Sequence, residues 1–348
     1  MKAQEKKWCE GTRILLKNEI PLETPITISI EASSLCNLKC NYCLHGVQNG
    51  NFPKQLMNFD LFVKAIDSLA GFPQKIKNIV FALNGEPFTN PQLPEMIRYI
   101  KQKNIADKVT VFTNAILLNE EIGQAVIDAG LDILRVSIQG VSSENYQTLC
   151  NTKVDYQRIV ENVARLYKYK EDNRINCHFF VKVVDQSLKD KSEEIKFYND
   201  FGDICDQISI ETIVPIRIEV DYSNQEVTVD KNLVKQRHQG ADVCPQPFYG
   251  MYLRSNGTVI ACCIADINKQ VIGDAARDGL PDIWKSKALQ DIRKQQLLRK
   301  RYENSECKKC SYPDCGMQTN DNIDDVAEIL LEKMFGENNE YGMRDHIH

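Results

Sequence analysis

Short apolar runs rich in β-branched residues alternate with longer amphipathic segments over the first two thirds of the chain. The runs that we predict as strands are 26–30, 79–83, 109–112, 133–138, 179–184 and 208–214. The segments that we predict as helices are 60–70, 93–103, 120–129, 159–169 and 192–201. Strands separated by helices of this length indicate βαβ units and a parallel sheet. Six such units are fewer than the eight of a closed (β/α) barrel.

The pattern changes after about residue 220 to short strands, turns and cysteines, so we place a domain boundary near Asp230. We expect an N-terminal extension at 1–24, an α/β domain at 25–230, a cysteine-containing module at 231–318 and a tail at 319–348. From Asp321 the tail predicts an acidic amphipathic helix whose apolar face carries Val326, Ile329, Leu330 and Met334.

Composition places the chain among ordinary soluble proteins. Its 348 residues, 43 % of them hydrophobic, suffice for one large domain and a smaller module. The first residues carry lysines without a following apolar stretch, and no run of about 18 apolar residues occurs, so we expect a cytoplasmic protein without a membrane span. Thirteen cysteines then suit metal ligands and buried thiols better than disulfides. A net charge of −5 argues against a nucleic-acid partner.

Three closely spaced cysteines, Cys36, Cys40 and Cys43, follow the first predicted strand. Three thiolates can hold three corners of a four-iron, four-sulfur cluster and leave the fourth iron open to a small ligand. A structural zinc site would need a fourth ligand, which His45 could supply. The spacing favours the cluster and leaves zinc as the alternative.

A second motif, Asn84-Gly85-Glu86-Pro87, comes directly after the second predicted strand. A turn here would leave backbone carbonyls and the Glu86 carboxylate free to accept hydrogen bonds from an ammonium group. Gly85 would let the backbone approach closely. The alternative is that Gly-Glu-Pro is only a turn.

Polar residues stand at the ends of the next two predicted strands, namely Thr113, Asn114, Ser137 and Gln139. In βα barrels the carboxyl ends of the strands form the active-site face, so these residues are well placed for ligands. Capping of the following helices is the alternative for each of them.

A third set of cysteines consists of Cys244, Cys262, Cys307 and Cys310. Four cysteines would suit a structural zinc site in isolation. Cys263 follows Cys262 on a predicted strand and should therefore point to the opposite face, and Cys315 is a further neighbour.

We interpret the remaining cysteines as core residues, and the basic run before Cys307 as a solvated helix face. These cysteines are Cys9, Cys150, Cys177 and Cys205, and the basic run is Arg293, Lys294, Arg299, Lys300 and Arg301.

These motifs together resemble the radical S-adenosylmethionine (SAM) enzymes. The cysteine spacing, with Tyr42 before the last cysteine, is similar to their signature, and residues 84–87 resemble their Gly-Gly-Glu-Pro motif with Asn84 in place of the first glycine. The turn at 255–257, Gly273-Asp274, Ile283-Trp284-Lys285 and the final Cys-x-x-Cys resemble a SPASM/twitch auxiliary-cluster domain. The resemblance covers roughly residues 26–318.

The resemblance implies a partial (β/α)6 barrel followed by a small iron–sulfur module of the twitch form. Cys36, Cys40 and Cys43 would hold the SAM-binding [4Fe–4S] cluster, and Cys244, Cys262, Cys307 and Cys310 one auxiliary [4Fe–4S] cluster. Contacts to SAM are implied for Tyr42, Gly85, Glu86, Pro87, Asn114, Ser137 and Gln139. Gln139 stands where many relatives have Asp, and Cys150 about where many have an Arg that contacts the SAM carboxylate. A reducing partner such as flavodoxin or ferredoxin is also implied.

The implied chemistry is reductive cleavage of SAM to a 5′-deoxyadenosyl radical, which takes a hydrogen atom from the substrate. An auxiliary cluster favours net two-electron oxidation, so we expect dehydrogenation of an alcohol or amine of a sugar-like small molecule. Modification of a peptide by thioether formation, crosslinking or epimerisation is the alternative. About 25 residues precede the first strand, too few for a fused leader-recognition domain, which favours the small molecule. A zinc-binding scaffold is the alternative of another class.

Overall fold

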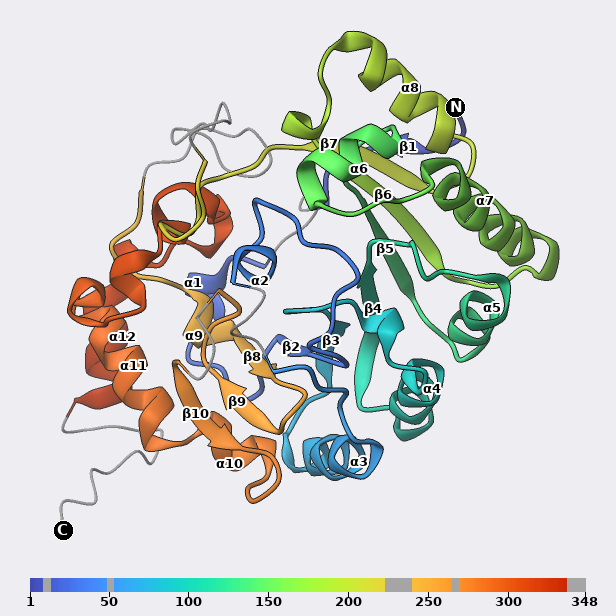
Figure 1. Ribbon diagram of the computed structural model, residues 1–348. Helices are drawn as coiled ribbons and strands as arrows, with labels where there is room; N and C mark the ends of the chain where they lie inside the picture. The colour runs from blue at the N-terminus through green and yellow to red at the C-terminus, as the bar shows by residue number, and fades with distance from the viewer. Residues whose placement is uncertain (9–13, 49–52, 223–239, 265–268, 337–348) are drawn as a thin grey trace.

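Six parallel strands form the centre of a curved ten-stranded sheet in the computed structural model (Figure 1). The structure describes residues 1–8, 14–48, 53–222, 240–264 and 269–336. The central strands follow one another in chain order and are β2 (Thr27–Ile30), β3 (Ile76–Phe81), β4 (Ala106–Thr113), β5 (Ile133–Ile138), β6 (His178–Val184) and β7 (Gln207–Glu211). The predicted α/β class and the open, partial barrel are confirmed.

Helices cover the outer face of this sheet, between successive strands (Figure 1). They are α3 (Phe59–Ser68), α4 (Leu93–Lys103), α5 (Glu120–Asp128), α7 (Tyr156–Asn173) and α8 (Lys191–Phe201). Side-chain caps start most of them, since Asn58, Asn119, Asp155 and Asp190 accept hydrogen bonds from first-turn backbone amides. One further helix, α6 (Ser143–Cys150), was not predicted because its sequence is largely polar and has no clear apolar stripe.

The sheet continues beyond the six central strands at both edges. At one edge β1 (Gln4–Glu5) pairs in parallel with β7. At the other edge β8 (Gly250–Leu253) pairs in parallel with β2, and β9 (Thr258–Ile260) and β10 (Val271–Asp274) follow antiparallel. The strands of the cysteine-containing module are therefore an extension of the barrel sheet. Because β8 lies beside β2, the module sits next to the strand that leads into the first three cysteines.

The remaining elements are short or lie around this second edge. The helices are α1 (Leu16–Glu19), α2 (Leu44–Val47), α9 (Gln246–Tyr249), α10 (Leu280–Trp284), α11 (Lys287–Leu297) and α12 (Ala327–Phe335). Single turns of 3₁₀ helix span Leu69–Gly71, Pro87–Thr89, Asp185–Ser187, Arg301–Glu303, Cys307–Lys309, Thr319–Asp321 and Asp324–Val326, and a π turn spans Tyr312–Gly316. Among the described residues no helix combines the length and apolar character that crossing a membrane requires.

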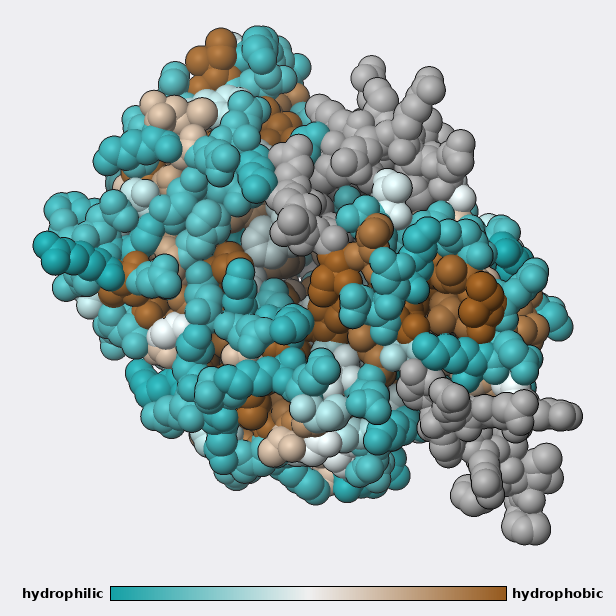
Figure 2. All heavy atoms as spheres, turned by 180° about the vertical axis from the view of Figure 1, so that it is seen from behind, coloured by the Kyte–Doolittle hydropathy of each residue, from teal (hydrophilic) through white to brown (hydrophobic). Residues whose placement is uncertain are grey.

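Three apolar clusters occur among the described residues. The larger cluster lies between the sheet and its helices, and the smaller cluster joins α1, α11 and α12. A third consists of Ala241, Tyr312 and Met317 and packs against Cys244 and Cys310. Leu330 and Met334 are buried in the smaller cluster as predicted, but Ile329 is 67 % exposed, so its predicted place on the packed face is wrong. The rear surface is mostly hydrophilic, with apolar groups showing between the charged ones (Figure 2).

The interpretation of the basic run as a solvated face is wrong for two of its members. Arg293 and Arg301 are only 3 % and 2 % exposed. The Arg293 guanidinium lies 4.0 Å from the centre of the Trp284 ring, and its Nε donates to the Pro247 carbonyl. Arg301 pairs with Asp314 at 2.6 Å.

Cys150, Cys177 and Cys205 are buried in the larger cluster as predicted, whereas Cys9 lies outside the described residues.

Candidate active site and auxiliary cysteine site

The first three cysteines lie in a tight loop between β2 and α2. The Cys43 amide donates to the Cys40 carbonyl at 3.2 Å, and Gly46 folds back onto the same residue. A Cβ atom at Gly46 would lie 2.2 Å from the Cys40 carbonyl oxygen, so a larger residue cannot occupy this position without moving the loop. His45 is buried with its Nε2 2.8 Å from the Ser34 carbonyl oxygen, so this nitrogen is engaged with the backbone.

The electrostatics of this loop are those of thiols that become thiolates on binding metal. Burial, helped by the nearby Glu86, Cys40 and Cys43, raises the pKa of Cys36 to about 12. A contact with Cys150 and then burial raise the pKa of Cys40. Thiols with raised pKa values release their protons when iron binds, so metal affinity will depend on pH. Three thiols in one loop fit a cluster with one open iron.

The turn at residues 84–87 packs directly against the cysteine loop. The Glu86 amide donates to the Leu35 carbonyl at 2.7 Å. Gly85 has a φ of +77°, and a Cβ there would lie 2.2 Å from the Ser33 carbonyl oxygen. Both the left-handed conformation and the close approach require glycine. The second motif and the cysteine loop therefore form one unit.

The Glu86 side chain joins this unit to the end of β4. Its carboxylate, in a residue only 3 % exposed, accepts hydrogen bonds from Thr113 Oγ1 at 2.7 Å, the Asn114 amide at 2.8 Å and the Phe88 amide at 3.2 Å. Burial raises the pKa of Glu86 from 4.5 to about 7, although these three hydrogen bonds oppose the shift. A carboxylate has about four acceptor positions, so about one remains for a ligand.

Other residues with predicted SAM contacts also meet at this edge of the sheet. Asn114 donates from Nδ2 to Asn37 Oδ1 at 2.7 Å, next to the first cysteine. The Tyr42 hydroxyl donates to Gln139 Oε1, and Gln139 Nε2 donates to the Ser137 carbonyl at 2.9 Å. The structure thus brings Asn114 and Gln139 to Asn37 and Tyr42 of the cysteine loop, and Pro87 is buried.

Sequence reasoning missed a polar row on neighbouring strands. Lys182 of β6 pairs in register with Ser137 of β5 and Ser209 of β7. Burial lowers the pKa of Lys182 to about 8, and Glu211 and Arg135 are its charged neighbours. The signal was present in the sequence as a single lysine inside an otherwise apolar strand.

Cys150 was expected about where many relatives carry an SAM-binding arginine. In the structure its Sγ lies 3.4 Å from Cys40 Sγ, against the first cysteine loop. The backbone carbonyls of Leu149 and Cys150 also accept hydrogen bonds from the amides of Asn41 and Lys39. The end of α6 therefore supports the cysteine loop.

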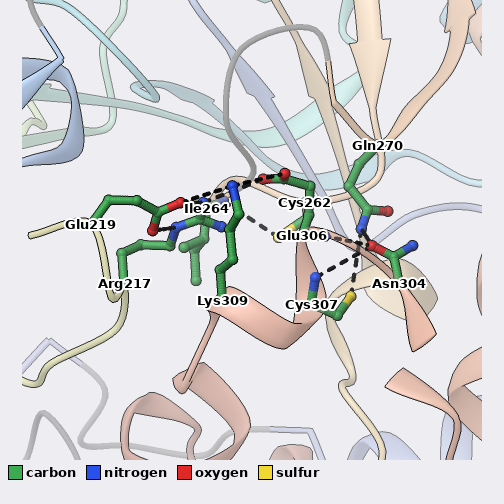
Figure 3. A network of polar contacts seen from close by, with 9 residues as sticks. All are labelled: Arg217, Glu219, Cys262, Ile264, Gln270, Asn304, Glu306, Cys307 and Lys309. Atoms are coloured by element: carbon green, nitrogen blue, oxygen red, sulfur yellow. Dashed lines mark hydrogen bonds and ion pairs between the residues drawn. The ribbon is translucent and has the colours of Figure 1, made fainter. Parts of the chain in front are cut away.

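The third set of cysteines lines one pocket, which together with the open solvent at its mouth encloses about 340 Å³. Cys244, Cys262, Cys307 and Cys310 all line it, whereas Cys263 and Cys315 are not among the lining residues. The Cys315 thiol instead lies 3.1 Å from the Ser311 carbonyl oxygen. The cysteines come from the segment before α9, the end of β9 and the turn that follows α11. Figure 3 shows Cys262 and Cys307 within the polar network around this pocket.

Hydrogen-bond donors face the sulfur atoms of this pocket. The Ile264 amide lies 3.4 Å from Cys262 Sγ, and the Tyr312 amide 3.4 Å from Cys310 Sγ. Burial raises the pKa of Cys310 to about 11 and raises those of Cys244 and Cys262. Within the described ranges, no three His, Cys, Asp or Glu side chains converge as ligands of one metal ion would. All four of these thiols line the pocket together.

The chain segment that leaves β7 also reaches this pocket. Arg217 lines it and pairs with Glu219 at 2.6 Å and with Glu306 at 3.3 Å (Figure 3). Arg217 also forms a β-bridge with Cys310. The last central strand and the auxiliary cysteines are therefore connected through main-chain pairing.

Comparison with known families agrees with this geometry. Residues 30–193 match the model of the radical SAM superfamily, and residues 244–311 match the SPASM iron–sulfur cluster-binding domain. The chain belongs to the radical SAM superfamily and carries a SPASM domain. Its cofactors are accordingly SAM and [4Fe–4S] clusters, which sets aside the zinc-scaffold alternative.

Individual relatives differ in their named activities. The chain is 24 % identical, over 82 % of its length and 87 % of the relative's, to a tungsten-containing aldehyde ferredoxin oxidoreductase cofactor-modifying protein of Pyrococcus furiosus. It is 39 % identical to a probable GTP 3′,8-cyclase of Methanococcus maripaludis, but over only 33 % of this chain and 36 % of the cyclase. That second match therefore concerns about a third of either protein.

Solved structures share the fold at low sequence identity. SuiB of Streptococcus suis bound to SAM has a TM-score of 0.59 at 14 % identity, covering 88 % of this chain and 79 % of SuiB. The enzyme anSMEcpe with bound SAM has a TM-score of 0.58 at 15 % identity, covering 88 % and 96 %. BtrN in complex with SAM and 2-DOIA has a TM-score of 0.52 at 15 % identity, covering 85 % and 96 %.

Proposed function

We propose that this protein is a radical SAM oxidoreductase that dehydrogenates an alcohol or amine of a sugar-like small molecule. The observation that carries the proposal is the single pocket lined by Cys244, Cys262, Cys307 and Cys310. The pocket belongs to a module whose strands β8 to β10 extend the sheet beside β2. A redox-active site built into the same sheet as the SAM site suits an oxidation, in which substrate electrons must leave.

In this proposal each cysteine set has its own cluster. Cys36, Cys40 and Cys43 hold the SAM-binding [4Fe–4S] cluster, and the four pocket cysteines hold one auxiliary [4Fe–4S] cluster, as the donor sets suggest. Bound together, SAM and its cluster supply a 5′-deoxyadenosyl radical that removes a hydrogen atom from the substrate. The Glu86 turn positions the amino end of SAM, and Tyr42, Asn114, Ser137 and Gln139 contact other parts of it.

A polar substrate would be oriented by Lys182 and Ser209, which lie in register on β6 and β7. Ser209 has a buried hydroxyl oxygen without a hydrogen-bond partner among the described residues. Lys182 supplies the neighbouring positive charge, and Arg135 is already held by Glu211 at 2.7 Å. A hydroxyl-bearing or amine-bearing small molecule could satisfy such groups, because buried polar atoms favour hydrogen-bonding partners.

Glu86→Gln is expected to weaken SAM binding by roughly tenfold or more, because a charge-assisted hydrogen bond contributes about 1.5–3 kcal/mol. The substitution keeps the shape of the side chain but turns an NH₂ group toward donors such as the Asn114 amide. Equilibrium binding of SAM to the reconstituted variant measures the effect, and cluster content should stay intact. Glu95→Gln, on the exposed face of α4, is the matched control. Unchanged SAM affinity in Glu86→Gln would mean that residues 85–87 form only a turn and that other residues bind SAM.

Glu86 should also make the metal-free protein less stable as pH rises. Its pKa is raised by burial from 4.5 to about 7, so between these values the folded state binds more protons than the unfolded state. The contribution of Glu86 to stability is therefore present below about pH 4.5 and lost as pH rises through about 7. We expect the unfolding free energy of wild type minus that of Glu86→Gln to fall from pH 5 to pH 8 in urea titrations of reduced protein. A difference that grows with pH would contradict the raised pKa.

Peptide modification is the second candidate function. The solved structures with this fold include SuiB bound to the precursor peptide SuiA and anSMEcpe bound to the peptide Cp18Cys. These likenesses support the fold, and the fold accommodates peptides in those proteins. Against this stands the longer sequence match to a protein named as cofactor-modifying.

The experiment that separates the two candidates is substrate-dependent formation of 5′-deoxyadenosine. The anaerobically reconstituted protein is incubated with SAM, a reductant and two panels, one of deuterated sugars and amino alcohols and one of deuterated cysteine-containing peptides. The proposal predicts deuterium transfer into 5′-deoxyadenosine, and a product two hydrogens lighter, with a member of the first panel. Deuterium transfer from peptides alone would replace it with the second candidate.

A further inference from the structure

Two glutamine amides converge on one sulfur atom of the auxiliary pocket. Gln270 Nε2 and Gln296 Nε2 each lie 3.5 Å from Cys307 Sγ. A neutral thiol is a weak hydrogen-bond acceptor, so two amides directed at it suit a thiolate better.

Gln296 ties two ligands that are far apart in the sequence. It is fully buried on α11, and its Oε1 accepts a hydrogen bond from the Cys244 amide at 3.1 Å. Its other end donates to Cys307 Sγ. Both polar atoms of the Gln296 side chain therefore form hydrogen bonds within the cysteine site.

Gln270 reaches the same sulfur at some cost to its backbone. It has a φ of +56°, in the left-handed region that side chains other than glycine rarely adopt. Its amide also donates to Asn304 Oδ1 at 2.9 Å, and that oxygen accepts from the Cys307 amide at 3.3 Å (Figure 3). Backbone strain of this kind persists where the surroundings enforce it, and it is frequent at functional sites.

A buried cation completes the surroundings of the pocket. Arg301 lines it, and its guanidinium pairs with Asp314 and donates to the Cys310 carbonyl at 3.4 Å. Among the described residues, the buried Arg301 Nε has no hydrogen-bond partner. A donor left unpaired at a pocket wall is expected to have a partner in the occupied site, because buried polar groups are nearly always satisfied.

We propose that Gln270, Gln296 and Arg301 form a donor set that raises the reduction potential of the auxiliary cluster. This inference rests on the proposed function, which assigns a [4Fe–4S] cluster to Cys244, Cys262, Cys307 and Cys310. A reduced cluster carries one more negative charge than an oxidised one, and hydrogen bonds to its sulfurs and nearby cations stabilise that charge. These three residues therefore act through the ligands as positioning residues and favour electron uptake at the auxiliary site.

Gln296→Met tests the proposal because it removes the donor and keeps a side chain of similar length. We expect the ratio of reduced to oxidised auxiliary cluster at a fixed solution potential to fall about tenfold, a shift of about 59 mV to more negative potential. The measurement is a redox titration of the reconstituted holoenzyme followed by electron paramagnetic resonance. The signal that changes when SAM is added belongs to the SAM-binding cluster, so the remaining signal reports the auxiliary cluster. Iron content should equal that of wild type.

The matched control is Gln290→Met on the same helix. Gln290 is also buried, and neither polar atom of its amide has a partner among the described residues. Its replacement should leave the potential unchanged. An unchanged potential in Gln296→Met with full iron content would overturn the proposal.

Gln270→Met keeps the proposal testable if Gln296→Met fails to hold iron. It should lower the potential in the same direction, since it removes the other amide from Cys307. Loss of the auxiliary cluster in both variants, with retention in Gln290→Met, would assign a structural role and overturn the inference. A wild-type enzyme with only about four irons would overturn the proposed auxiliary cluster as well, so the two failures are distinguishable.

Discussion

Replacing Cys36, Cys40 and Cys43 together with alanine is expected to remove about half of the iron and all reductive cleavage of SAM. The reason is that these three thiols are the donors in the loop after β2, and a four-iron cluster at each cysteine set gives about eight irons in total. Iron and sulfide analysis of the anaerobically reconstituted protein measures the first effect. Chromatographic quantification of 5′-deoxyadenosine measures the second.

Two buried cysteines provide the control for this triple variant. Cys177 and Cys205 are buried members of the main apolar cluster and belong to neither set of proposed ligands. Cys177→Ala and Cys205→Ala should keep about eight irons and full SAM cleavage. Continued SAM cleavage by the triple variant would show that the loop does not hold the SAM-binding cluster.

Replacing Cys244 or Cys310 with alanine is expected to leave SAM cleavage measurable but to abolish substrate oxidation. Both cysteines line the auxiliary pocket, which in the proposed function acts after hydrogen abstraction. Product formation and 5′-deoxyadenosine are measured in the same reaction, so that the ratio between them separates the two steps.

Cys263→Ala is the control because Cys263 is adjacent to a pocket cysteine but does not line the pocket. It should keep the wild-type ratio of product to 5′-deoxyadenosine. Metal binding and folding are coupled, so soluble yield is recorded for every variant. Product formation at the wild-type rate in soluble Cys244→Ala would limit the auxiliary cluster to a structural role.

The sequence was sufficient to predict the central strands and most of their helices, because their apolar periodicity is local. It was not sufficient to predict how the sheet ends. β1 has only two residues, and the pairing of β8 with β2 joins segments more than two hundred residues apart. Pairing across such distances depends on which edge is open in the folded sheet, which periodicity along the chain does not encode.

The same distinction applies to the site. The spacing of Cys36, Cys40 and Cys43 and the turn at Gly85 could be predicted from the sequence, because both are local features of the chain. Gln296 and Arg301 became apparent only in the structure, because the tertiary fold brings α11 and the following turn to the pocket. The basic run was misread for Arg293 and Arg301 because charge alone does not reveal a buried partner such as Asp314.

The central claim is that this protein cleaves SAM reductively at the cluster of its first cysteine loop. The most direct test is to incubate the anaerobically reconstituted wild-type protein with SAM and dithionite and to quantify both products. We expect methionine and 5′-deoxyadenosine in equal amounts, dependent on the reductant. A fully reconstituted protein that forms neither product above the level of the Cys36, Cys40 and Cys43 triple variant would contradict it.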